Sequence, residues 1–220
     1  MSTPKQVNVG LIGLGAMGAG MAGSLRRNGY NVHVYDIRPE AVTGFTAGGG
    51  IACASAQAVA SSCPIVVSVL VNAAQTEHLL FGEAGIAATM QPGSVFVMCS
   101  TVDPNVSIQW ADRLEALGIH YLDAPISGGA AKAATGQMTM MTAGKPAAYE
   151  AAGGVLDAMA AKVYRLGEAA GNGSKVKIIN QLLAGVHIAA AAEAMALGIR
   201  EGVPADDLYE VITNSAGNSW

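Results

Sequence analysis

The sequence predicts an α/β fold in which a doubly wound, mostly parallel sheet is followed by the start of an all-α domain. Short apolar runs alternate with helical patterns from residue 8 to residue 166. A glycine-rich turn, GLGAMG, follows the first apolar run and opens a helix of small residues. Apolar residues make up 51% of the chain and charged residues only 13%, which suits helices packed closely on both faces of a parallel sheet. Together these observations indicate a Rossmann-type fold.

The predicted elements follow one another in a regular order. Strands are expected at residues 8–12, 31–35, 65–70, 95–99 and 119–123, with helices between them at 17–28, 39–47, 56–62, 72–81 and 104–117. Such a series requires right-handed crossovers and gives a parallel sheet. Two further strands, at 137–142 and 162–165, flank a helix that begins at Pro146, and we expect them to extend the sheet edge. The first domain therefore comprises residues 1–166.

Residues 167–220 have a helical pattern. A long helix opens after Glu168 and continues through Gly198, and another follows it. The segment 182–199 is almost as apolar as a membrane span, but it is mostly alanine and contains His187 and Glu193, which are costly inside a bilayer. We interpret it as a helix buried by protein. Residues 167–220 are thus expected to hold an interdomain helix and the beginning of a helical domain that looks truncated at Trp220.

Charge and cysteine content exclude several classes of function. The formal net charge is -4, and the sequence has no basic stripe for a nucleic acid backbone or an anionic membrane. The three cysteines are odd in number and lack CxxC spacing, so neither a disulfide framework nor a metal site is indicated. The N-terminal residues lack the pattern of a secretion signal. We expect a cytoplasmic protein whose partner is a small molecule.

The glycine turn predicts a dinucleotide site. Gly13 allows a tight turn out of the strand, Gly15 allows backbone to approach a pyrophosphate, and Gly18 allows helix and strand to pack closely. The backbone N–H groups of Ala16 and Met17, at the new helix start, face the anion. The alternative is a plain strand–helix connection.

Asp36 indicates which dinucleotide binds. It ends the second strand about twenty residues after the glycines, where a carboxylate accepts hydrogen bonds from the adenosine ribose hydroxyls and repels a 2′-phosphate. Ile37 and Arg38 complete this part of the site, and Arg38 softens the repulsion in principle. NAD is therefore favoured over NADP. The alternative role of Asp36 is that of an ordinary turn residue.

Residues after the next two strands complete the expected cofactor site, since ligands lie beyond the carboxyl ends of parallel strands. Leu70, Val71 and Asn72 are expected near the adenosine ribose, although Asn72 is equally suited to cap a helix. Thr101, with Ser100 before it, contacts the nicotinamide end or caps the helix that opens at Pro104. Both alternatives stay open for these residues.

The segment DAPISGGAAKAAT, at 123–135, follows the fifth strand. Ser127, Gly128 and Gly129 offer a hydroxyl and backbone N–H donors to a substrate carboxylate, as a small anion nest does. A flexible turn is the alternative. Asp123, at the start of the segment, is interpreted as bracing the loop rather than titrating in catalysis.

The segment GNGSKVKIINQ, at 171–181, contains the candidate proton-transfer residue. Lys177 shares one helix face with Asn180 and Gln181, whereas Lys175 points elsewhere. A lysine near a helix N-terminus among small apolar residues has its ammonium form disfavoured, as proton transfer requires. The alternative is a solvated lysine.

Five features in this order and spacing carry a family resemblance: GLIGLGAMG, Asp36, CSTVDP, DAPISGGAAKAATGQM and GNGSKVKIINQLLAG. Through them the sequence resembles the β-hydroxyacid dehydrogenases over essentially all of its 220 residues. The resemblance implies NAD-dependent oxidation of a hydroxyl of a small hydroxy acid or sugar acid, without a metal. It also implies a homo-oligomer when full length. Family members continue beyond GNSW, so this chain is expected to bind NAD, to have weak or no turnover, and to leave the apolar helix from Leu182 partly uncovered and prone to association.

The resemblance also implies roles for particular residues. Lys177 is the general acid/base, residues 127–129 hold the substrate carboxylate, Asn180 or Gln181 orients the substrate or the lysine, and Thr101 contacts the nicotinamide ribose region. Two alternatives remain. One is reduction of a semialdehyde or an imine on the same fold, and the other is a non-catalytic NAD-binding module.

Overall fold

A computed structural model describes residues 7–219 of the chain. The chain divides into two compact units, Met1–Lys177 and Ile178–Trp220. The first unit contains two sheets and the helices around them. The second contains most of one long helix and a shorter one. The predicted division at residues 166/167 stays a prediction.

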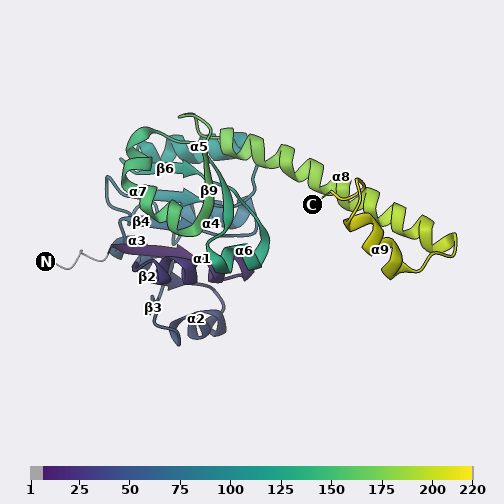
Figure 1. Ribbon diagram of the computed structural model, residues 1–220. Coiled ribbons are helices and arrows are strands. Elements are labelled where there is room, and N and C mark those ends of the chain that lie inside the picture. Colours follow the sequence, from purple (N-terminus) through teal and green to yellow (C-terminus); the bar gives the residue numbers. More distant parts are fainter. Residues whose placement is uncertain (1–6, 220) are drawn as a thin grey trace, which may run out of the picture. The chain divides into compact units, whose positions relative to one another are not determined.

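The first unit is built on a six-stranded sheet in which every neighbouring pair is parallel (Figure 1). Its strands are β1 (Asn8–Ile12), β2 (Asn31–Tyr35), β3 (Ile51–Ala52), β4 (Ile65–Ser68), β5 (Val95–Met98) and β6 (His120–Asp123). The order across the sheet is β3-β2-β1-β4-β5-β6. This is the Rossmann order, with the change of winding direction between β1 and β4, and it confirms the predicted fold.

Helices connect these strands: α1 (Ala16–Arg27), α2 (Pro39–Thr46), α3 (Ala56–Ser62), α4 (Ala73–Phe81) and α5 (Pro104–Glu115). Side chains cap several of them. Ser55 accepts the N–H of Ala58 at 3.1 Å, and Asp103 accepts that of Asn105 at 2.7 Å. The bounds of these strands and helices that the sequence predicted agree to within two residues, whereas β3 was not predicted because two residues show no alternation.

A second sheet follows, and here the sequence-based expectation was wrong. The strands β8 (Met138–Thr142) and β9 (Ala160–Arg165) do not extend the main sheet but pair with each other and, through β8, with β7 (Ile126–Ser127). Asp123 exchanges two backbone hydrogen bonds with Ala143, at 3.0 and 2.8 Å. This pairing continues past Pro125, whose carbonyl oxygen accepts the N–H of Met141 at 2.9 Å, and it leads into β7. The chain after β6 therefore pairs with β8, and the second sheet forms there.

The core lies on both faces of the main sheet. One face packs against α1, α6 (Gly129–Thr135) and α7 (Pro146–Met159), and it buries Met21 and Leu25. The other face packs against α3, α4 and α5, and it buries Trp110 and Leu114. All residues of β4 and β5 are buried, as expected for central strands of a doubly covered sheet. This packing fixes the carboxyl ends of the strands, where the candidate site lies.

The helix α8 (Asn172–Arg200) begins in the first unit and continues into the second, where α9 (Ala205–Thr213) follows it. Within the second unit, Leu208 of α9 packs against Gly198, where an added methyl group would lie 2.5 Å from it. The buried residues of α8 are Gly173, Ser174 and Lys177. The segment 182–199 is largely exposed, with Leu182 at 67%, which agrees with the expectation of a partly uncovered helix and not with that of a buried one. Among the described helices, α8 is long and apolar enough to span a membrane by length and composition alone.

Candidate active site

The glycine turn has different spatial demands at its three glycines. Gly13 has a φ of +98°, and a Cβ there would lie 2.3 Å from the carbonyl oxygen of Val69. A Cβ at Gly18 would lie 1.8 Å from the carbonyl oxygen of Gly13, so α1 packs directly against the turn. A Cβ at Gly15 meets no atom within 4 Å. The first and third glycines thus serve the fold, whereas the second borders open space.

The N-terminus of α1 is suited to an anion. Gly15 is its N-cap residue, and no side chain in the described part of the chain caps the helix there. Gly15 and Ala16 are exposed, and Met17 is half-buried. The first backbone N–H groups of a helix have no partner within it, and together with the helix dipole they bind phosphate groups.

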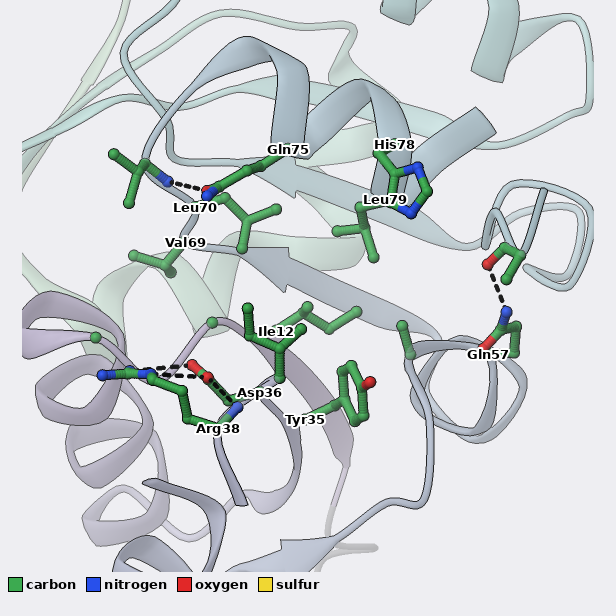
Figure 2. A pocket seen from close by; sticks show the side chains of 16 residues that line it. Ile12, Tyr35, Asp36, Arg38, Gln57, Val69, Leu70, Gln75, His78 and Leu79 are labelled. Atoms are coloured by element: carbon green, nitrogen blue, oxygen red, sulfur yellow. Dashed lines mark hydrogen bonds and ion pairs between the residues drawn. The ribbon is translucent and has the colours of Figure 1, made fainter. Parts of the chain in front are cut away.

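Asp36 lies directly after β2 and is held by three groups. Figure 2 shows the two that come from Arg38. The Asp36 carboxylate accepts the N–H of Leu14 at 2.6 Å and that of Arg38 at 2.9 Å, and it pairs with the Arg38 guanidinium at 3.1 Å. Burial alone would raise the pKa of Asp36, but the hydrogen bonds from Arg38 and Leu14 together lower it. The Asp36 side chain is 7% exposed and that of Arg38 is 52% exposed. An ionised carboxylate is therefore fixed at the edge of the turn.

A cavity of about 530 Å³ lies beside this carboxylate, between the ends of β1, β2 and β4 and the helices α3 and α4. The predicted cofactor residues among its lining are Gly13, Gly15, Asp36, Ile37, Arg38, Leu70 and Val71. Sequence reasoning missed Tyr35, Gln57, Gln75, His78 and Leu79, which also line it (Figure 2). The last four belong to α3 and α4. They can be identified as lining residues only once it is known that these helices pack beside the strand ends.

Three polar residues that follow β4 and β5 have distinct positions. Asn72 accepts the N–H of Gln75 at 2.9 Å, so it caps α4. Ser100 is buried, and its hydroxyl donates to the carbonyl oxygen of Leu70 at 2.9 Å, joining the two loops. The alternative that Ser100 or Thr101 caps α5 is wrong, because Asp103 does so. Thr101 is exposed, and its contact with the cofactor stays a prediction.

Residues 127–129 run from the end of β7 into the start of α6. Ser127 pairs with Thr139 of β8, and Gly128 and Gly129 have φ values of +136° and +77°. Both glycines are exposed at the start of α6, and Ser127 is half-buried. Their role in holding a carboxylate stays a prediction.

Lys177 lies on the buried face of α8 and is 6% exposed. Burial lowers the pKa of its ammonium group. Lys175 is exposed, and its ammonium donates to the side chain of Asn172 at 3.2 Å, so the two lysines point in different directions, as the helix spacing predicted. Asn180 and Gln181 belong to the second unit, and their roles stay predictions. The lowered pKa is what a proton-accepting lysine needs.

Together, the turn, the carboxylate and the cavity define a dinucleotide-binding domain of the Rossmann class. Among the described residues no group of histidine, cysteine and acidic side chains could hold a metal ion. The family described as the NAD binding domain of 6-phosphogluconate dehydrogenase matches residues 8–167. The family described as NAD-binding of NADP-dependent 3-hydroxyisobutyrate dehydrogenase matches residues 171–220.

Individual relatives indicate which members of the dehydrogenase family this chain is similar to. An L-threonate dehydrogenase of Cupriavidus necator is 60% identical over 97% of this chain and 72% of its own length. One from Escherichia coli K12 is 45% identical over 100% of this chain and 73% of its own. The crystal structure of a 3-hydroxyisobutyrate dehydrogenase from Salmonella typhimurium has a TM-score of 0.94 at 48% identity, covering 98% of this chain and 75% of that one. The chain belongs to the β-hydroxyacid dehydrogenase family and is an NAD-dependent hydroxyacid dehydrogenase.

Proposed function

We propose that the protein oxidises L-threonate at its C2 hydroxyl to the corresponding 2-oxo acid, with NAD as the hydride acceptor. The observation that carries the proton-transfer part is the buried Lys177, with its lowered pKa, on α8. The choice of substrate is supported by the L-threonate dehydrogenase of Cupriavidus necator, at 60% identity.

The residues of the first unit fit NAD. Open space at Gly15 leaves room for a pyrophosphate above the start of α1, and the ionised Asp36 suits a ribose with free hydroxyls. The cavity beside Asp36 has apolar walls, including Ile12, Leu70 and Leu79, that suit an adenine ring. Bound NAD supplies the acceptor for the hydride that leaves C2.

Lys177 provides the proton transfer that must accompany hydride loss. Its neutral amine accepts the hydroxyl proton as the carbonyl forms, and in the reverse direction its ammonium returns that proton. Residues 127–129 would hold the carboxylate of the substrate through a hydroxyl and backbone N–H groups. Asn180 or Gln181 would orient the substrate or the lysine, and Thr101 would contact the nicotinamide ribose region.

A panel of short hydroxy acids tests the substrate. NADH formation is measured with L-threonate, 3-hydroxyisobutyrate, L-serine and glycerate, and we expect kcat/KM to be highest for L-threonate. Lys177→Met should abolish turnover and keep NAD binding, whereas the matched variant Lys175→Met, at an exposed lysine of the same helix, should keep both. A higher kcat/KM for another acid would refute the threonate assignment. NAD binding without turnover of any acid would favour the non-catalytic module instead.

A second candidate substrate is 3-hydroxyisobutyrate. It is favoured by the Salmonella typhimurium 3-hydroxyisobutyrate dehydrogenase, which matches this chain at 48% identity and a TM-score of 0.94. The two acids differ in polarity and in the reacting carbon, because threonate carries hydroxyl groups on C2, C3 and C4, whereas 3-hydroxyisobutyrate carries one hydroxyl, on C3, and a methyl branch on C2. Their kcat/KM values in the same assay therefore separate the two candidates directly.

A further inference from the structure

We infer that Asp123 is a positioning residue for Lys177, acting through Ser174 to fix the rotation and depth of the first turn of α8. The inference rests on the proposed function only in calling Lys177 the proton-transfer residue. The contact between Asp123 and Ser174 of α8, called the clamp below, is a separate observation.

The clamp uses both oxygens of one buried carboxylate. Asp123 ends β6, at the carboxyl edge of the main sheet, and is fully buried. One of its oxygens accepts the backbone N–H of Ser174 at 2.8 Å, and the other accepts the Ser174 hydroxyl at 2.6 Å. Two hydrogen bonds to a single residue define an orientation as well as a distance. The first turn of α8 is therefore held against rotation about its own axis.

A close backbone approach fixes the depth of the same turn. A Cβ on Gly173 would lie 2.3 Å from the carbonyl oxygen of Met141 and 2.8 Å from that of Asp123. Only glycine fits between these two backbones without displacement. The Asn172 side chain also donates to the carbonyl oxygen of Leu166 at 3.1 Å. The helix start is thus attached to the end of β6, the end of β8 and the loop after β9.

Lys177 depends on this attachment because it lies one helical turn beyond Ser174. Residues three apart share a helix face, and Gly173, Ser174 and Lys177 are the buried residues of α8. A shift of one residue in the rotation of the helix, about 100°, would carry the amine off that face. Burial is what lowers the pKa of Lys177, so the Asp123–Ser174 clamp sets both the position and the basicity of the amine.

The cost of burying Asp123 argues that it does more than stabilise the fold. A buried carboxylate loses its hydration, and burial raises the pKa of Asp123, while hydrogen bonds, the largest from Ser174 and smaller ones from Ser107 and the Gly171 backbone, oppose that change. A neutral cap would satisfy a helix N-terminus at lower cost. The carboxylate instead supplies two acceptor oxygens to one serine, which is the property that positioning requires.

The test measures the basicity of Lys177 without relying on turnover. Lys177 is acylated with an amine-selective reagent across a pH series, its labelling midpoint is read by peptide mass spectrometry, and the exposed Lys175 serves as the internal reference. Ser174→Ala changes no charge, and Asp123→Asn keeps one acceptor. In both variants we expect the Lys177 midpoint to rise toward the ordinary lysine value, each pH unit being a tenfold change in the proton equilibrium. Ser174→Thr, which keeps the hydroxyl, should restore the lower midpoint.

A control separates positioning from loss of stability. The Ser24 hydroxyl is also buried and donates to the carbonyl oxygen of Ala158 at 2.7 Å, but it belongs to α1. Ser24→Ala should lower the thermal midpoint as Ser174→Ala does and leave the Lys177 labelling midpoint unchanged. In the turnover assay, Ser174→Ala should lower kcat about ten- to hundredfold and leave the KM for NAD unchanged, because a misplaced group slows the reaction step.

The outcomes distinguish this inference from the proposed function. An unchanged Lys177 midpoint in both Ser174→Ala and Asp123→Asn overturns the inference, whatever the protein catalyses. A raised midpoint, together with full turnover by Lys177→Met, supports the clamp and refutes the catalytic role of the lysine. If Ser174→Ala does not fold, Asp123→Asn with NAD binding as the check of folding gives the same comparison.

Discussion

Gly15→Ala should abolish NAD binding while leaving the stability of the fold nearly unchanged. Gly15 has a φ of −64°, which any L-residue adopts, and a Cβ there meets no atom within 4 Å. Replacing glycine by alanine at a compatible position stabilises by about 0.4–1 kcal/mol through the unfolded chain. Alanine is a poorer N-cap residue than glycine by roughly 0.5–1 kcal/mol, which offsets that gain. We therefore expect the free energy of unfolding to change by less than about 0.5 kcal/mol.

Gly18→Ala is the matched variant with the opposite expectation. Its Cβ would lie 1.8 Å from the carbonyl oxygen of Gly13, roughly 1.6 Å short of ordinary contact. The obstructing atom is backbone, so α1 or the turn must move, and overpacking of this kind costs about 1–3 kcal/mol. For a unit of this size that lowers the thermal midpoint by about 2–4 °C per kcal/mol.

Urea unfolding followed by circular dichroism measures both stabilities, and quenching of protein fluorescence by NADH measures binding. Gly15→Ala is expected to unfold at the wild-type urea concentration and to show no saturable binding. Retained NADH affinity in Gly15→Ala would refute the approach of a pyrophosphate to this part of the backbone. A wild-type unfolding midpoint in Gly18→Ala would refute the close contact between α1 and the turn.

Three further predictions concern charge and burial. Asp36→Ser should lower NAD affinity and raise NADP affinity, each by about tenfold or more, because a charge-assisted hydrogen bond is lost and Arg38 is freed for a 2′-phosphate. An unchanged ratio of the NAD and NADP affinities in fluorescence titrations would contradict this. Lys177→Met should stabilise the protein at neutral pH, because below the lowered pKa of Lys177 the folded state holds a buried ammonium. The gain in the free energy of unfolding should shrink as pH rises toward the ordinary lysine pKa. An equal gain in Lys175→Met would show that burial is not the cause. Burial raises the pKa of Cys63 to about 12 and that of Cys99 further. At neutral pH a thiol reagent should therefore modify the half-buried Cys53 first. Equal labelling of all three cysteines in the native state would be inconsistent with the described core.

Local patterns sufficed to predict the nucleotide turn and the main sheet apart from its two-residue edge strand β3. Each buried strand is an apolar run bounded by turn residues, and each glycine of the turn has a local spatial reason visible in the spacing GxGxxG. The position of Asp36 followed from the same argument, because it depends only on the length of one strand–helix–strand unit. Its ion pair with Arg38 is also local, two residues along the chain.

Features that depend on contacts between distant segments were not predictable in this way. The second sheet forms because the chain after β6 pairs with β8, and no periodicity in the sequence indicates with which sheet a later strand will pair. Gln57 and His78 line the cavity because α3 and α4 pack beside the strand ends. Likewise, the sequence indicated that Asp123 braces a structure, but its partner Ser174 lies 51 residues away.

The central place of β1 has a consequence for the order in which the nucleotide site is assembled. β1 is the first strand of the described residues, and its partner β2 follows soon after, so Gly13 can form its hydrogen bond to the carbonyl of Tyr35 early. Its other neighbour is β4, and the bond from Val69 N–H to the carbonyl of Ile12 requires closure of a much longer loop. During synthesis, the turn therefore remains open on one side until β4 has emerged and docked. NAD binding therefore requires that β4 has paired with β1. Bound NAD in turn stabilises this pairing by mass action.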